Sequence, residues 1–146
     1  MTDRHVSRAL DVDAPPAAVF DVLADPRAHG SFDGSGTVRS AVAGPERLIL
    51  GARFGMSMRV GVPYTIRNEV VEFEQDRLIA WRHLGHHRWR YELEPLDGGR
   101  TRVTETFDWS DSRLPWAIEL VGYPATNTRA IEKTLPRLKA HVEGRS

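Results

Sequence analysis

Glu105 is the residue of this chain with the clearest potential for acid–base chemistry. It belongs to a segment in which alternate residues share one face, namely Thr101, Val103, Glu105, Phe107 and Trp109. If Val103 and Phe107 point into the interior, the Glu105 carboxyl points there too, where its pKa should rise and it could act as a general acid or base. Two plainer roles stay open: an ion pair with Arg67 or Arg59, and a strand end that is open to water.

Three other side chains could share a proton with Glu105. Tyr64 and Tyr91 carry hydroxyls that donate or accept hydrogen bonds, and His83 could shuttle a proton near neutral pH. The alternative for His83 is an ordinary histidine at the end of a strand. The candidate catalytic residues are therefore Glu105, His83, Tyr64 and Tyr91, and the sequence does not decide whether there is catalysis.

A histidine-rich stretch raises the question of a metal site. His83, His86 and His87 are close in sequence, but Gly85 predicts a turn and no carboxylate stands nearby at ligand spacing. The chain has no cysteine, which excludes a disulfide framework, thiolate catalysis and a zinc site of the cysteine type. We expect no metal and no cofactor.

The first elements that must position these groups are a strand and one or two short helices. Residues 6–12 alternate as a strand does, and Asp13 can cap the helix that follows, whose first turn contains prolines. Asp25 and Pro26 end this helix. Residues 27–32 could form a second short helical turn.

The middle of the chain predicts a run of antiparallel strands. We expect them at residues 37–42, 48–60, 64–73, 77–84, 87–93 and 101–109. Residues 48–60 show the clearest alternation, from Leu48 to Val60 on one face. In residues 64–73 the apolar face changes, which predicts a bulge near residues 68–70. Asp97-Gly98-Gly99 predicts a tight hairpin turn.

The last element is a long helix with one apolar stripe. From Ser112 the periodicity changes to three and four residues, and the stripe contains Trp116, Leu120, Tyr123, Asn127, Ile131, Leu135, Leu138 and Val142. This pattern predicts a helix of roughly thirty residues that ends near Glu143. Pro124 should kink or break it.

Composition limits the class of protein. The chain has 146 residues, with 20 Lys and Arg balanced by 20 Asp and Glu, so we expect one domain spanning residues 1–146 and no nucleic-acid partner. An arginine-rich set, Arg82, Arg88, Arg90, Arg100 and Arg102, is expected on the wet face of the sheet, with a functional basic patch as the alternative. The sequence shows no signal peptide and no membrane span, and together with the absence of cysteine this predicts a cytoplasmic protein without integral membrane association. We expect a monomer or homodimer, between which the sequence does not decide.

Two motifs connect the chain to a known family. They are residues 14–25, APPAAVFDVLAD, and residues 91–104, YELEPLDGGRTRVT. The chain resembles the START-like (SRPBCC) superfamily, in particular its polyketide cyclase/dehydratase and lipid-transport branch. This resemblance implies an α+β helix-grip fold, in which a curved antiparallel sheet of about seven strands wraps around a long C-terminal helix and encloses a ligand cavity.

The inward faces derived above give the residues that would line this cavity. The sheet would contribute Phe54, Met56, Met58, Tyr64, Trp81, His83, Trp89, Tyr91, Glu105 and Phe107, and the helix Trp116, Leu120, Tyr123, Asn127 and Ile131. The alternative is that the aromatic residues and methionines only fill a core. Asn127 could orient a polar group of a ligand or bind a neighbouring strand.

Two functions remain open. The first is binding or carriage of a hydrophobic small molecule, such as a lipid, polyketide or aromatic metabolite. The second is a polyketide aromatase/cyclase or dehydratase that uses the same cavity for aldol closure or loss of water. The two motifs match the scaffold and not a catalytic set, so the identity of the ligand and the presence of catalysis stay undecided.

Overall fold

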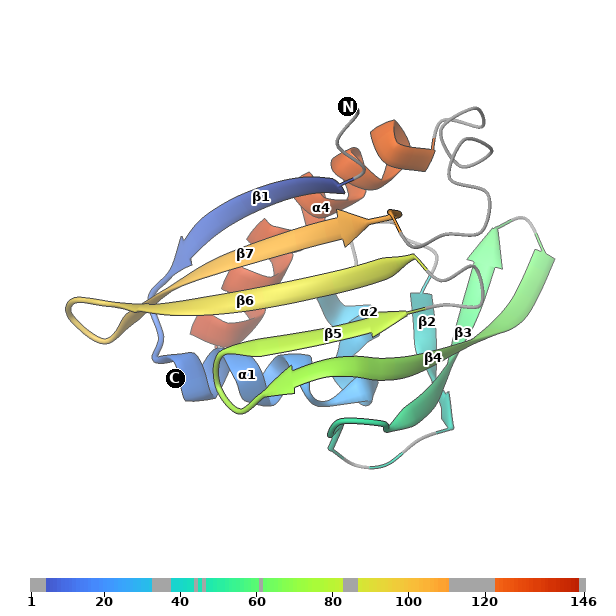
Figure 1. The fold of residues 1–146 in the computed structure, drawn as a ribbon, viewed down its shortest axis with the longest axis horizontal. Coiled ribbons are helices and arrows are strands. Elements are labelled where there is room, and N and C mark those ends of the chain that lie inside the picture. The colour runs from blue at the N-terminus through green and yellow to red at the C-terminus, as the bar shows by residue number, and fades with distance from the viewer. Residues whose placement is uncertain are drawn as a thin grey trace.

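The computed structural model describes residues 5–32, 38–43, 45, 47–60, 62–82, 87–110 and 123–144. Figure 1 shows the arrangement of these parts as a sheet with the helices on one side. The elements in chain order are β1 (His5–Val12), α1 (Pro16–Leu23), the 3-10 helix η1 (Pro26–Ala28), α2 (His29–Phe32), β2 (Val38–Ala43), β3 (Arg53–Val60), β4 (Val62–Glu74), β5 (Leu78–Arg82), β6 (Arg88–Leu96), β7 (Arg100–Asp108) and α4 (Tyr123–Glu143).

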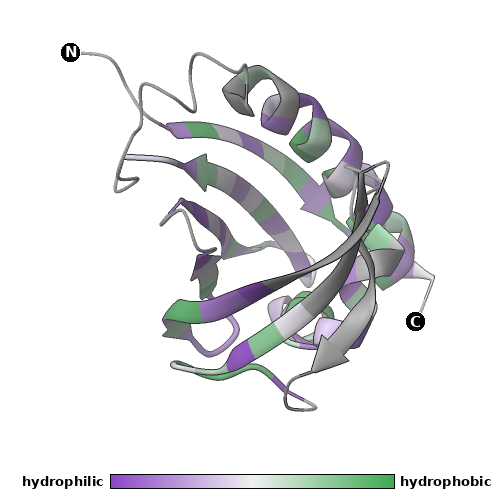
Figure 2. Cartoon of the chain, turned by 90° about the vertical axis from the view of Figure 1, so that its right-hand side faces the viewer, coloured by the Kyte–Doolittle hydropathy of each residue, from purple (hydrophilic) through white to green (hydrophobic). Residues whose placement is uncertain are grey.

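The described strands form one seven-stranded antiparallel sheet in the order β1-β7-β6-β5-β4-β3-β2. The first strand therefore pairs with the last one, in a register that runs from His5 opposite Asp108 to Val12 opposite Thr101. Figure 2 shows that the sheet is strongly curved. Helix α4 packs against β1 and β7, and α1 packs against β6 and β7. We call the face that these helices cover the inner face.

The inner face follows the alternation predicted for the last strand. Thr101, Val103, Glu105, Phe107 and Trp109 are all buried. The helical stripe is also confirmed, because Ile131, Leu135, Leu138 and Val142 of α4 are buried. Sheet and helix thus bury their apolar faces against the same core, which is the main source of stability for such a layered fold.

The start of α1 differs from the prediction. Pro15 occupies the N-cap position and no side chain caps the helix, so the capping role predicted for Asp13 is wrong. The backbone N–H of Asp13 instead donates to Oε2 of Glu143 on α4, at 2.8 Å. After α1, the Asp25 carboxylate accepts a hydrogen bond from the backbone N–H of Arg27, which caps η1. The predicted second helical turn corresponds to η1 and α2.

The strand predicted over residues 48–60 is shorter in the structure. Strand β3 begins at Arg53, because a turn closed by the Ala52 N–H and the Ile49 carbonyl precedes it, with Gly51 at φ +81°. Leu50 is 62% exposed, although it was predicted to share the buried face with Leu48. Leu48 is fully buried and its N–H donates to the Ala24 carbonyl.

The bulge predicted in the next strand is confirmed. The register between β4 and β5 shifts between Val70 and Glu72. As a result Val70 is buried and Phe73 packs edge-on against Phe20 of α1, with ring centroids 5.5 Å apart. The intervening Glu72 points to the outer face. The bulge therefore keeps both apolar residues on the inner face.

The C-terminal helix is described as 21 residues, Tyr123–Glu143. The part of the prediction that covers residues 112–122 lies outside the described residues. Pro124 is the second residue of α4, a position where the missing N–H removes no helical hydrogen bond. Pro136 lies inside the helix, and no expectation from the sequence addressed it.

The turn between β6 and β7 is confirmed at Asp97-Gly98-Gly99. Both glycines have positive φ, +78° for Gly98 and +73° for Gly99. Leu96 pairs with Arg100, so the loop has three residues, and glycine adopts the positive φ at two of them without strain. This turn sets the register that places Tyr91 opposite Glu105.

Candidate functional site

The centre of the candidate site is a buried hydrogen bond between two neighbouring strands. Tyr91 of β6 and Glu105 of β7 are direct cross-strand partners. The Tyr91 hydroxyl donates to Oε2 of Glu105 at 2.8 Å. Tyr91 is 3% exposed and Glu105 is 2% exposed. The expected inward direction of Glu105 is therefore confirmed, and its alternative placement at a strand end open to water is wrong.

The ion-pair alternatives for Glu105 have different outcomes. Arg67 is exposed on β4, and no ion pair joins it to Glu105 in the described structure. Only the backbone of Arg59 is described, so that alternative stays untested. The buried carboxyl is held by a phenol hydroxyl, and a phenol–carboxyl pair of this kind can accept or donate a proton toward a third group placed next to it.

An aromatic cluster surrounds one side of this pair. We call it the first aromatic cluster, and its members are His29, Phe32, Phe54, Trp81 and Tyr91. The His29 ring stacks on Trp81 with centroids 4.7 Å apart, and Trp81 lies 5.5 Å from the Tyr91 ring. The rings thus form a continuous apolar wall from α2 to β6 that ends at the Glu105 carboxyl.

His29 is a polar member of this wall that the sequence reasoning missed. It is 5% exposed, and its Nε2 lies 2.9 Å from the Leu23 carbonyl oxygen. Because a carbonyl oxygen only accepts, Nε2 carries the hydrogen and donates it. The sequence predicted only a short helical turn here, and four residues of α2 are too few for a periodicity that shows which side chain is buried.

A second aromatic cluster lies on the neighbouring strands. Its members are His87, Trp89, Phe107 and Trp109. The Phe107 ring is central, with centroid distances of 4.8 Å to Trp89 and 5.4 Å to His87. Burial lowers the pKa of His87 below its ordinary value, so this ring is uncharged at neutral pH. The inner face therefore presents an uncharged aromatic surface here.

The remaining sheet residues of the expected lining lie on β3, β4 and the segment after β5. Met56 is paired in register with Ile66, and Met58 with Tyr64, but only the backbone of these residues is described. His83 lies outside the described residues. Their roles in a ligand site therefore stay predictions.

Of the helical residues expected to line the cavity, some are described by the structure and others lie outside the described residues. Tyr123 is the first residue of α4, Asn127 is half-buried one turn later, and Ile131 is fully buried. Trp116 and Leu120 lie outside the described residues. The structure therefore brings Asn127 and Ile131 to the covered side of α4 and leaves their contact with a ligand a prediction.

Asn68 is a second polar residue that was not among the site residues predicted from the sequence. It is 4% exposed and lies on β4 opposite Phe54 of β3. Its Oδ1 is buried and has no hydrogen-bond partner among the described residues. The sequence contained a signal for it, because the alternation of residues 64–70 places Asn68 on the same face as Val70.

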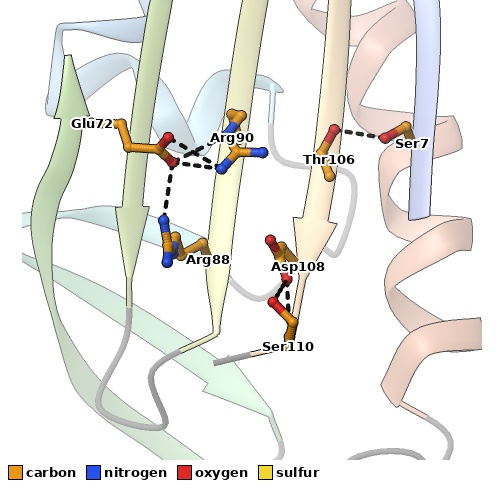
Figure 3. A network of polar contacts seen from close by, with 7 residues as sticks. All are labelled: Ser7, Glu72, Arg88, Arg90, Thr106, Asp108 and Ser110. Atoms are coloured by element: carbon orange, nitrogen blue, oxygen red, sulfur yellow. Dashed lines mark hydrogen bonds and ion pairs between the residues drawn. The ribbon is translucent and has the colours of Figure 1, made fainter. Parts of the chain in front are cut away.

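The outer face of the sheet carries the predicted arginines, Arg82, Arg88, Arg90, Arg100 and Arg102. Figure 3 shows Glu72 between Arg88 and Arg90, and the shortest of these contacts is 2.8 Å from Arg90. Asp11 pairs with Arg102 at 2.9 Å and with Arg100 at 3.6 Å, and Glu69 lies 3.7 Å from Arg82. Each of the five guanidinium groups thus lies near a carboxylate, although Glu72 and Asp11 each serve two of them.

Within the described ranges, no group of three or more histidine, aspartate or glutamate side chains is placed to hold a metal ion. No described helix is both long and apolar enough to cross a membrane.

The sequence matches a family described as polyketide cyclase / dehydrase and lipid transport, over residues 3–143. It is also 40% identical over 151 residues to the uncharacterized protein Rv0088 of Mycobacterium tuberculosis. That alignment covers 97% of this chain and 66% of the relative. The chain thus spans just under two thirds of the length of the curated relatives it matches.

Solved structures of low sequence identity share the architecture. A START superfamily protein of Mycobacterium smegmatis has a TM-score of 0.75 and 15% identity, with 97% of this chain and 99% of that chain covered. An AHSA1-like protein of Aeromonas hydrophila has a TM-score of 0.63 and 18% identity, with 96% and 94% covered. The curved sheet and the C-terminal helix are those of the helix-grip fold.

Proposed function

This chain belongs to the polyketide cyclase/dehydrase and lipid transport family, and from that premise we propose that it binds an uncharged hydrophobic small molecule between the inner face of the sheet and α4. The aromatic clusters support this, because apolar walls with a few convergent polar groups are typical of small-molecule sites. The ligand class is a lipid, a polyketide or an aromatic metabolite. Fold alone does not choose among them.

The observation that carries the proposal is the buried Tyr91–Glu105 hydrogen bond at the edge of the first aromatic cluster. A polar pair inside an apolar interior costs free energy unless it is well satisfied, so a purely structural core has little use for it. In a binding site the same pair orients a hydroxyl or carbonyl group of the ligand, while the aromatic rings bury its apolar body.

Native mass spectrometry of the freshly purified protein tests this proposal. We expect a fraction of the protein to carry a molecule of defined mass that is absent from the denatured chain. Equilibrium dialysis with 2-methylnaphthalene, an uncharged aromatic probe, should also show saturable binding. A protein that is free of any bound molecule and also fails to bind this probe or decanol would overturn the binding function.

A second function is favoured by the same pair. A carboxyl group and a phenol in hydrogen-bond contact can act together as base and acid, removing a proton from carbon and returning one to a departing hydroxyl group, which leaves as water. We therefore infer, as the alternative, a cyclase or dehydratase that acts on a polyketide-like substrate bound in the same place.

Glu105→Gln separates the two functions once a native ligand has been identified. In a binding protein the variant retains affinity within a few-fold and no turnover is lost, because none exists. In an enzyme the turnover rate falls by about a hundredfold or more, while affinity changes little. Glu92→Gln is the matched control, because Glu92 is exposed on β6 and the same chemical change there leaves the inner face intact.

A further inference from the structure

The amide oxygen of Asn68, Oδ1, is a buried polar atom without a hydrogen-bond partner among the described residues. The side chain is 4% exposed, and its Oδ1 accepts no hydrogen bond from the described residues. Buried polar atoms of this kind are rare in native proteins, because each one loses its hydrogen bonds to water without compensation. Such an atom at a candidate site indicates a position where the donor group of a ligand can bind.

The surroundings of Asn68 are aromatic. Its cross-strand neighbour on β3 is Phe54, whose ring lies 5.6 Å from His29 and 5.8 Å from Trp81. Two residues further along β4, Val70 pairs in register with Trp81. The amide oxygen therefore lies at the border of the first aromatic cluster, on the inner face of the sheet.

Asn68 and Glu105 mark two separate polar positions on this face. Glu105 is in register with Tyr91, Tyr91 with Ile79, and Ile79 with Phe73 of β4. Asn68 comes five residues before Phe73 on β4, beyond the pair formed by Val70 and Trp81. A ligand that contacts the aromatic cluster can thus meet a polar group at either end of it.

The chemistry of an amide oxygen restricts what can bind there. A carbonyl oxygen accepts hydrogen bonds and donates none, so it favours a hydroxyl or N–H group over an ether or an alkyl group of the same size. The neighbouring rings favour a flat apolar body that can stack. A site built to bind a hydroxyl discriminates strongly against analogues that lack it.

We propose that Asn68 is a specificity-determining residue, whose Oδ1 accepts a hydrogen bond from the hydroxyl group of an uncharged aromatic ligand held against Phe54 and Trp81. This inference rests on the proposed binding function and names the ligand class for it: a phenol or enol rather than a simple hydrocarbon or an acyl chain.

Equilibrium dialysis with three matched probes tests the inference. 2-Naphthol carries the hydroxyl, 2-methoxynaphthalene keeps the oxygen but has no donor, and 2-methylnaphthalene has neither. We expect the wild-type protein to bind 2-naphthol about tenfold more tightly than 2-methoxynaphthalene, which is the ordinary value of one hydrogen bond. Asn68→Leu should lower the affinity for 2-naphthol by about tenfold and change the affinity for 2-methylnaphthalene by less than twofold.

Thr104→Val is the control variant, because Thr104 lies on β7 between the inward residues Val103 and Glu105 and therefore points to the outer face. It should leave all three affinities unchanged. If Asn68→Leu changes the affinities for 2-naphthol and 2-methylnaphthalene by the same factor, the role of Asn68 is overturned while the binding function stands. If that variant does not fold, the wild-type comparison decides alone, and equal affinities for 2-naphthol and 2-methoxynaphthalene overturn the inference. If none of the three probes binds but decanol does, the aromatic ligand class proposed here is overturned while the binding function stands. The binding function fails as well only if decanol also does not bind and native mass spectrometry finds no bound molecule.

Discussion

At the scale of single residues, the hydrogen bond between Tyr91 and Glu105 gives a direct test of the interior. Tyr91→Phe removes the hydroxyl that donates to the buried carboxyl and leaves the ring in place. Because a buried acceptor then loses a donor, we expect the free energy of unfolding to fall by about 1–3 kcal/mol. Urea denaturation at neutral pH, followed by circular dichroism, measures this change.

The double variant Tyr91→Phe with Glu105→Leu controls for the loss of the hydroxyl itself. It removes both polar groups, so it should be more stable than Tyr91→Phe alone. Glu92→Gln on the exposed side of β6 should change the unfolding free energy by less than about 0.5 kcal/mol. Equal stabilities of Tyr91→Phe and the wild type would show that the hydroxyl does not stabilise the carboxyl.

His87 predicts a pH dependence of stability. Burial lowers its pKa in the folded protein below the ordinary value of 6.5, which applies to the unfolded chain. Above pH 6.5 the ring is neutral in both states. As the pH falls below 6.5 the unfolded chain binds a proton that the folded protein does not, so stability falls until the folded ring is protonated too. Thermal unfolding between pH 7.5 and pH 5 should show this decrease in Tm.

His87→Phe should make the decrease in Tm smaller between pH 7.5 and pH 5. Asp11, Asp108 and Glu143 do not interfere in this range, because each has a lowered pKa and its contribution to stability is lost only at more acidic pH. The buried His29 is unchanged in the variant and serves as the common background. An identical pH profile for both proteins would contradict the role of His87.

The sequence was informative for residues on long alternating strands and not for others. Glu105 could be placed on the inner face because apolar neighbours on both sides fixed the direction of its strand. The alternation of its strand also predicted the face on which Asn68 lies. The sequence gives no sign, however, that the amide oxygen has no hydrogen-bond partner. His29 could not be found, since its burial depends on contacts with Trp81 and Phe54 that come from distant strands.

At the scale of elements, the β6–β7 turn combines two glycines in the left-handed region. Gly99→Ala should lower the free energy of unfolding by about 1 kcal/mol, because alanine disfavours the φ of +73° found there. An added Cβ meets no atom within 4 Å, so this cost is conformational and not steric contact with neighbours. Chemical denaturation measures it.

Asp97→Ala is the control, because it changes a residue of the same turn whose φ is not positive. Asp97 is exposed and adjoins the two glycines, so we expect its replacement to change stability by less than about 0.5 kcal/mol. If Gly99→Ala is as stable as Asp97→Ala, the turn adopts another conformation in solution.

The elements themselves were largely predictable, and the errors have physical causes. The bulge in β4 followed from apolar residues that changed face, which only an extra residue can reconcile. The overlong strand at residues 48–60 arose because Leu48 and Leu50 continue the alternation of β3, although the chain turns at residues 49–52, before β3 begins. Gly51 was the one local sign of that turn, and the alternating apolar residues on both sides of it favoured a continuous strand. The Asp13 cap failed because α1 begins later than that cap requires: Pro15 is the N-cap residue, and Asp13 lies two residues before it.

At the scale of the whole molecule, the two faces of the sheet have different chemistry. The inner face carries aromatic rings and isolated polar groups, whereas the outer face carries arginines that are paired with Glu69, Glu72 and Asp11. This separation, in a chain of zero formal net charge, supports the proposal that an uncharged ligand binds on the inner face. The curated relatives are longer than this chain, so a function of the entire relative is not implied by the site alone.

The pairing of β1 with β7 has a consequence for how the protein is made. The first strand has no partner in the sheet until the ribosome has synthesised residues 101–108, about a hundred residues later. The chain therefore cannot complete its sheet during most of its synthesis, and contacts this distant in sequence slow folding to milliseconds or seconds. Stopped-flow refolding should show such a phase. Until then β1 is without its partner strand, so nascent chains of this protein should be frequent clients of ribosome-associated chaperones.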